Sequence, residues 1–200
     1  MKSTQSKIRT LTGAALLSAL IIVLQIVSNF IPPVGGVTIT LSLVPIVIGA
    51  AMFGPLTGAV LGFVLGGIVF ISGLLGWDGG FVLLLLKINP YVGVFICFFK
   101  TIAAGFVSGL LHKILVNKNK TLSVFASSMV CPIVNTGLFV LAMTAFYSSV
   151  FSQGASDNGT SVLVYLILVV AGVNFIVEFL INTILSPAIL RIIDIVKKNK

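Results

Sequence analysis

Residues 55–75 read PLTGAVLGFVLGGIVFISGLL and contain no charged side chain. A helix of this length rises about 30 Å, which matches the hydrocarbon core of a lipid bilayer. Gly54, Gly58, Gly62 and Gly66 repeat every four residues. That spacing places small residues on one face, where the backbone of a second helix can approach closely. We therefore expect a transmembrane helix that is packed tightly against a neighbour.

The composition of the whole chain indicates the same environment. Of its 200 residues, 58% are hydrophobic and only 8% are charged. Soluble domains carry roughly 25% charged residues, so this chain could not cover a water-exposed surface. The composition excludes a soluble enzyme and predicts an integral membrane protein.

Polar residues, glycines and prolines divide the apolar sequence into six candidate spans. We expect an all-α fold in which residues 1–200 form a single membrane domain of six transmembrane helices. The second candidate is short, so it is expected to be tilted or partly unwound. The predicted spans are 11–31, 39–53, 55–75, 89–111, 122–148 and 161–190, with outer loops near 31–38, 72–88 and 149–160.

The basic residues predict the orientation in the membrane. With six spans, ten of the twelve fall on one side, at the two termini and between the fourth and fifth spans. The positive-inside rule then places both termini in the cytoplasm, with anionic lipid headgroups rather than nucleic acid as partners. These ten are Lys2, Lys7, Arg9, Lys113, Lys118, Lys120, Arg191, Lys197, Lys198 and Lys200.

Two charged residues lie near the middle of predicted spans, Lys100 in the fourth and Glu178 in the sixth. An ionisable group inside a membrane costs about 2.5–3.5 kcal/mol on insertion scales and is a candidate functional group. Asn174 and Asn182 share a helix face with Glu178, and Asn135 lies in the fifth span. Two interpretations remain open. Either Lys100 and Glu178 pair while the amides join helices, or these groups line a polar cavity. Because the first three spans contain few such groups, the last three are the expected site.

Several further features bear on function. Trp77, in the second outer loop, either anchors the chain at the membrane interface or belongs to a lid over a pocket. Ala15 and Ala19 form a flat stripe on the first span, suited to helix packing. The chain has no G-x-x-x-x-G-K-[ST] phosphate loop, and its one histidine, His112, has no cluster of metal-ligand spacing around it. We therefore expect no enzymatic activity, no cofactor and no metal site.

The residues taken together resemble a known family. The features are the Ala15-x-x-x-Ala19 stripe, the run SLVPIVIGAAMFGPLTG over residues 42–58, and Lys100 ahead of Ala104-Gly105. Over essentially its whole length the chain resembles the substrate-binding S component of energy-coupling factor (ECF) transporters. The resemblance implies a multi-pass protein of the bacterial plasma membrane that captures a vitamin in a pocket built mainly by helices four to six.

The resemblance also implies partners and a substrate class. Such proteins assemble with a membrane-embedded T component and two cytoplasmic ATPases, and Ala15 and Ala19 would face the T component. Riboflavin is disfavoured, because Leu43 stands where the riboflavin branch has an acidic residue. Pantothenate, or folate, is favoured as a substrate for Lys100 and the asparagines. A stand-alone ion-coupled carrier or channel and a ligand-free assembly subunit remain as alternatives.

Overall fold

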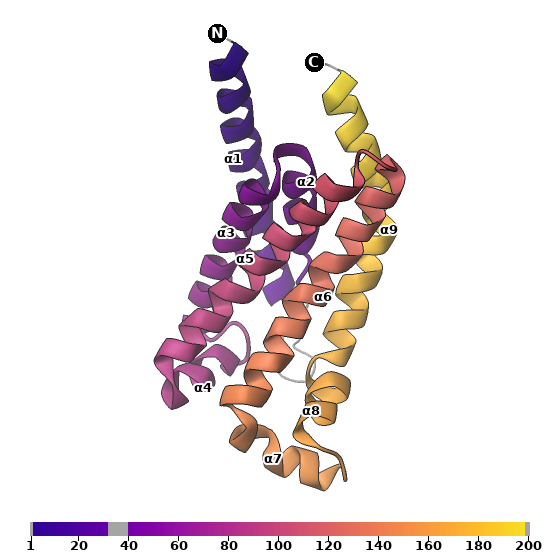
Figure 1. Ribbon diagram of the computed structural model, residues 1–200. Coiled ribbons are helices and arrows are strands. Elements are labelled where there is room, and N and C mark those ends of the chain that lie inside the picture. The colour runs from indigo at the N-terminus through magenta and orange to yellow at the C-terminus, as the bar shows by residue number, and fades with distance from the viewer. Residues whose placement is uncertain (1, 32–39, 199–200) are drawn as a thin grey trace.

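The computed structural model describes residues 2–31 and 40–198, and all regular structure in these residues is helical (Figure 1). Five helices are long and apolar enough to cross a membrane, judged by length and composition. They are α1 (Lys2–Asn29), α3 (Pro55–Leu74), α5 (Pro90–Leu115), α6 (Lys120–Phe146) and α9 (Gly172–Lys198).

The second predicted span is a short helix, α2 (Leu43–Phe53), of 11 residues. It rises about 16 Å, roughly half the thickness of the hydrocarbon core. The count of six spans therefore stays a prediction. The predicted sixth span is divided in the structure into α8 (Val162–Tyr165), a π-helical turn η1 (Leu166–Val170) and α9, with a break at Ala171.

Two segments predicted as loops contain helices instead. Helix α4 (Phe81–Ile88) lies within the predicted loop 72–88, and α7 (Ser148–Asp157) begins one residue before the predicted loop 149–160 and otherwise lies within it. Asn89 lies between α4 and α5. Its side chain accepts a hydrogen bond from the backbone N–H of Val92, at 3.2 Å. This N-cap, with Pro90 in the first turn, starts a new helix directly after α4.

The free ends of α1 and α9 lie at the same end of the molecule, and α4, α7 and α8 lie at the opposite end (Figure 1). Two contacts hold the first end together. The Arg9 guanidinium donates to the carbonyl of Val196 at 2.6 Å, and Lys120 forms an ion pair with Asp194. Arg9 and Lys120 thus lie at the same end of the described helices, and the orientation in the membrane stays a prediction.

The glycines of α3 form its crossing with α5. A Cβ atom added at Gly58 would lie 2.3 Å from the carbonyl oxygen of Gly105, and one at Gly62 would lie 2.2 Å from that of Thr101. Gly54 does not belong to this face, because it separates α2 from α3 with a φ of 99°. The close approach fixes the position of Thr101, and with it the neighbouring Lys100.

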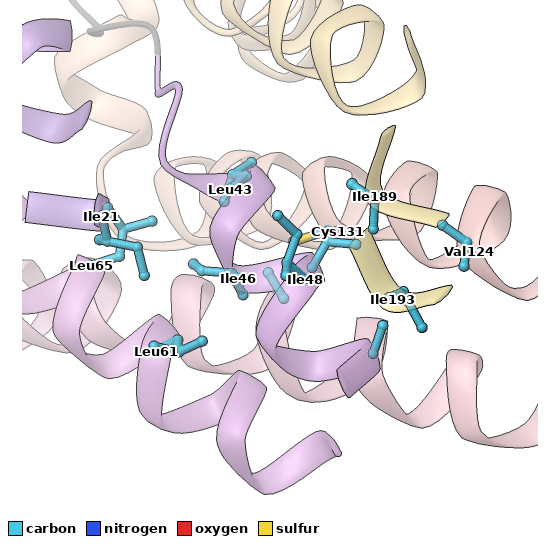
Figure 2. Packing of buried hydrophobic residues seen from close by; sticks show 13 residues of the cluster. Ile21, Leu43, Ile46, Ile48, Leu61, Leu65, Val124, Cys131, Ile189 and Ile193 are labelled. Carbon is cyan, nitrogen blue, oxygen red and sulfur yellow. The ribbon is translucent and has the colours of Figure 1, made fainter. Parts of the chain in front are cut away.

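Buried side chains form two apolar clusters. In the first, α2 lies between residues of α1 and α3 on one side and residues of α6 and α9 on the other (Figure 2). Ile46 of α2, for example, is fully buried. The second cluster joins α4, α5, α6 and η1 around Phe139, Met143 and Tyr147. The Tyr147 hydroxyl donates to the carbonyl of Asn89 at 3.0 Å, which ties the end of α6 to the start of α5.

Candidate functional site

A cavity lies between α3, α4, α5, α6 and α9. Thr40, which precedes α2 in the chain, also lines it. The walls of the cavity combine the aromatic rings of Phe81 and Phe139 with polar side chains. The cavity has a volume of about 60 Å³. That is room for about four waters, so a vitamin-sized solute requires the walls to part. The polar lining residues are Thr40, Asp78, Lys100, Thr136, Asn174 and Glu178.

Lys100 reaches this cavity from α5. Its ammonium nitrogen lies 5.1 Å from the centre of the Phe139 ring, in a cation–π contact. Among the described residues, no carboxylate oxygen lies within 4.0 Å of it. Of the two interpretations that the sequence left open, the structure does not contain the direct Lys100–Glu178 ion pair. The two charges share one cavity without neutralising each other at contact distance.

Glu178 lies on α9 with only 3% of its surface exposed. One carboxylate oxygen, Oε1, accepts a hydrogen bond from the backbone N–H of Thr40 at 3.1 Å. The other, Oε2, is buried and has no hydrogen-bond partner among the described residues. A buried charged acceptor that lacks a donor is costly, so this oxygen is the strongest sign of a ligand contact in the cavity.

The three predicted asparagines surround Glu178 from two helices. Asn174 lies one turn earlier on α9 and lines the cavity. Asn135 of α6 is buried, and its side chain lies beside the Glu178 carboxylate. Asn182 lies one turn later, where its amide donates to the carbonyl of Glu178 at 2.8 Å. After the break at Ala171, α9 begins just before Asn174, the first of these residues on that helix.

Asp78 is a cavity residue that the sequence analysis placed only in an outer loop. It is 8% exposed. Its two carboxylate oxygens accept hydrogen bonds from the backbone N–H groups of Gly80, at 2.9 Å, and Val82, at 2.7 Å. Gly80 adopts a φ of 84°, which glycine tolerates, and α4 begins after it. The Asp-Gly-Gly sequence before an apolar run was the available signal for this cap.

Replacing Asp78 with alanine should release the start of α4, because the N–H groups of Gly80 and Val82 lose their acceptor. Loss of such a cap costs about 1–2 kcal/mol. We expect the amides of Gly80 and Val82 to exchange hydrogen about 5- to 30-fold faster in the variant. Asp157→Ala, an exposed residue of α7, is the control and should leave this exchange unchanged. Unaltered protection in Asp78→Ala would contradict the capping role.

Trp77 lies outside this cavity. Its side chain is 51% exposed and lines a separate depression with Ile26, Asn29 and Phe30 at the end of α1. Ala15 and Ala19 are both exposed on α1 and do not line the cavity either. The predicted site residues thus fall into three places, namely the cavity, the depression at Trp77 and the outer face of α1.

A second polar cluster, in the first three helices, was not expected from the sequence. Ser42 donates to Gln25 at 3.2 Å, and Asn29 donates to Ser72 at 2.9 Å. Ser28 accepts from the backbone N–H of Leu41 at 3.3 Å. These groups bond to one another and to the backbone, whereas Glu178 retains an unused oxygen. The cluster therefore holds helices together, and the cavity remains the candidate binding site.

The profile of a family described as "ECF transporter, substrate-specific component" matches residues 9–190. The chain belongs to this family. A search of curated proteins returned no match. ECF S components are substrate-binding transport subunits rather than enzymes, which agrees with a polar cavity inside a helical membrane protein. This S component is thus a multi-pass membrane protein that binds a solute for an ECF importer.

Proposed function

We propose that this S component captures a water-soluble vitamin or related micronutrient in the Lys100–Glu178 cavity. It then passes the solute through a complex with a membrane-embedded T component and two cytoplasmic ATPases in the bacterial plasma membrane. The observation that carries the proposal is the pair of oppositely charged residues that line one cavity without an ion pair between them. Charges held in an apolar bundle at this cost favour a ligand that uses them.

Pantothenate is the first candidate and folate the second. Both carry a carboxylate for Lys100 and amide or hydroxyl groups for Asn135 and Asn174. Riboflavin is disfavoured, since Leu43 is a fully buried residue of the first apolar cluster and offers no polar contact.

Thermal unfolding of the detergent-solubilised protein tests the proposal. A ligand at 100 times its dissociation constant stabilises the folded state by about 2.7 kcal/mol. We expect pantothenate or folate to raise the unfolding temperature by several degrees without ATP, and thiamine to leave it unchanged. Mass spectrometry of small molecules that co-purify provides an independent identification. A folded protein that responds to no vitamin and carries no bound solute would contradict the proposal.

The alternative of a stand-alone ion-coupled carrier is motivated by the same two intramembrane charges. It differs in its energy source. Uptake by the S component should stop in cells that lack the two ATPases, whereas a carrier would continue at an unchanged rate. A carrier would also lose ion coupling, but keep solute affinity, when Lys100 or Glu178 is neutralised.

A further inference from the structure

Three buried hydrogen-bond acceptors lie at or behind the α6–α9 side of the cavity; Glu178 lines the cavity, whereas Asn135 and Asn182 are not among its lining residues. Glu178 Oε2, Asn135 Oδ1 and Asn182 Oδ1 are all buried without a hydrogen-bond partner among the described residues. Glu178 and its two amide neighbours lie close together, because Asn135 borders the carboxylate and Asn182 is one turn away on the same helix. Buried acceptors without donors are destabilising. A ligand that contacts Glu178 Oε2 in the cavity must therefore present an N–H or O–H group to it.

The α5 side of the cavity has the opposite chemistry. The Lys100 ammonium lies over the Phe139 ring and has no carboxylate within 4.0 Å among the described residues. The nearby cavity carboxylate, Asp78, is already engaged by two backbone N–H groups. Among the described residues Lys100 thus has no carboxylate at contact distance, and an anionic group of a solute can pair with it directly.

We propose that the ligand of this cavity is a two-ended organic anion. Its carboxylate or phosphate binds Lys100, and a separate donor-bearing end binds Glu178. A small anion without donors leaves Glu178 Oε2 unpaired and meets repulsion from Glu178. A cation meets repulsion from Lys100, and a neutral solute leaves the ammonium without a counter-ion. This inference rests on the proposed function and narrows it to a substrate class.

A panel of six vitamins separates these ligand classes on the solubilised wild-type protein. Pantothenate, folate and biotin are anions with N–H or O–H donors away from the carboxylate. Nicotinate is an anion without such a donor, thiamine is a cation, and pyridoxine is neutral. We expect stabilisation only by a member of the first group. The uncharged alcohol or ester of that compound should bind at least 10-fold more weakly.

Two substitutions assign the ends of the ligand. Lys100→Met should weaken binding of the anion by about 10- to 100-fold, the range for hydrogen bonds to charged groups, and should abolish its preference over the uncharged analogue. Glu178→Gln removes an acceptor oxygen and should weaken binding of the uncharged analogue, and it should weaken the anion less, because it also removes a negative charge that repels the anion. Lys87→Met and Asp157→Asn, at exposed positions outside the cavity, are the matched controls and should bind like wild type. Lys100→Arg keeps the cation and should retain the preference, which separates charge from folding.

These outcomes distinguish a failure of the two-ended ligand from a failure of the proposed solute-capturing function. Binding of nicotinate, thiamine or pyridoxine overturns the two-ended ligand but leaves a solute-capturing function in place. If folded Lys100→Met protein still prefers the anion over the uncharged analogue, the two-ended ligand is also overturned. The solute-capturing function again stays in place. If the folded wild-type protein binds none of the six compounds and carries no co-purified solute, the proposed vitamin-capturing function fails, and the inference fails with it.

Discussion

Replacing Gly62 with alanine is expected to prevent normal packing of α3 against α5. The new Cβ would lie 2.2 Å from the carbonyl oxygen of Thr101 and 2.9 Å from the Cα of Ile102. These are backbone atoms, so no side chain can rotate away and the two helices must separate. Overpacking of this kind costs about 1–3 kcal/mol or more. We expect a large loss of folded, monodisperse protein after membrane extraction, with an unfolding temperature several degrees lower in what remains.

Gly67→Ala is the matched control, five residues along the same helix. A Cβ at Gly67 would meet only Phe98 Cε1, at 3.7 Å, an ordinary van der Waals contact. Alanine also has the higher helix propensity, by about 1 kcal/mol in water. This variant should therefore be at least as stable as wild type. Equal yield and stability for the two variants would show that the α3–α5 crossing tolerates separation.

The same crossing has a consequence for binding. Lys100 precedes Thr101, whose carbonyl is in contact with Gly62. A displaced α5 carries Lys100 away from Phe139 and from the cavity. Any Gly62→Ala protein that is recovered should therefore bind solute more weakly than Gly67→Ala, even though neither glycine lines the cavity.

The helix contacts of α3 were largely predictable, because periodicity along one helix is a local property. The four-residue repeat correctly indicated the close approach at Gly58, Gly62 and Gly66. It failed at Gly54, where the neighbouring Pro55 starts a new helix and the glycine takes a positive φ instead of a packing position. The predicted spans 39–53 and 55–75 already left Gly54 between two helices, so the helix boundary was the better guide to this glycine than the four-residue repeat.

The charged cavity was predictable only in part. Lys100 and Glu178 were recognisable because they interrupt apolar runs, and the structure brings both to one cavity. Whether they pair depends on the rotation of α5 relative to α9, which no local pattern encodes. Asp78 was missed because its burial depends on α4 folding back after it. Trp77 precedes Asp78 but lines a different depression, and its placement also depends on how α4 folds back.

We propose that the outer face of α1 docks the T component, as the resemblance to ECF S components implied for Ala15 and Ala19. In the most apolar stretch of α1, only 11% is buried inside the protein. The corresponding share in the other four long helices is 28–39%. Ala15 and Ala19 are both exposed there, one turn apart. A stripe of small side chains lets a second helix come close, and the ECF family implies a membrane-embedded T component as that second protein.

Replacing Ala19 with tryptophan should abolish transport while sparing solute binding, because the indole fills the space that the T-component helix would occupy. Ala15→Trp should act in the same way. Purified variants should keep the ligand-induced rise in unfolding temperature, whereas co-purification with the T component and uptake by cells should both fall to background.

Ile184→Trp is the control for these two variants, since it places the same side chain on an apolar α9 position that is 70% exposed. It should assemble and transport normally if the effect belongs to α1. Loss of transport in all three variants would indicate a general disturbance in the membrane. If Ala19→Trp transports normally, α1 is not the docking face. The evidence for the cavity would be unaffected, because α1 does not line it.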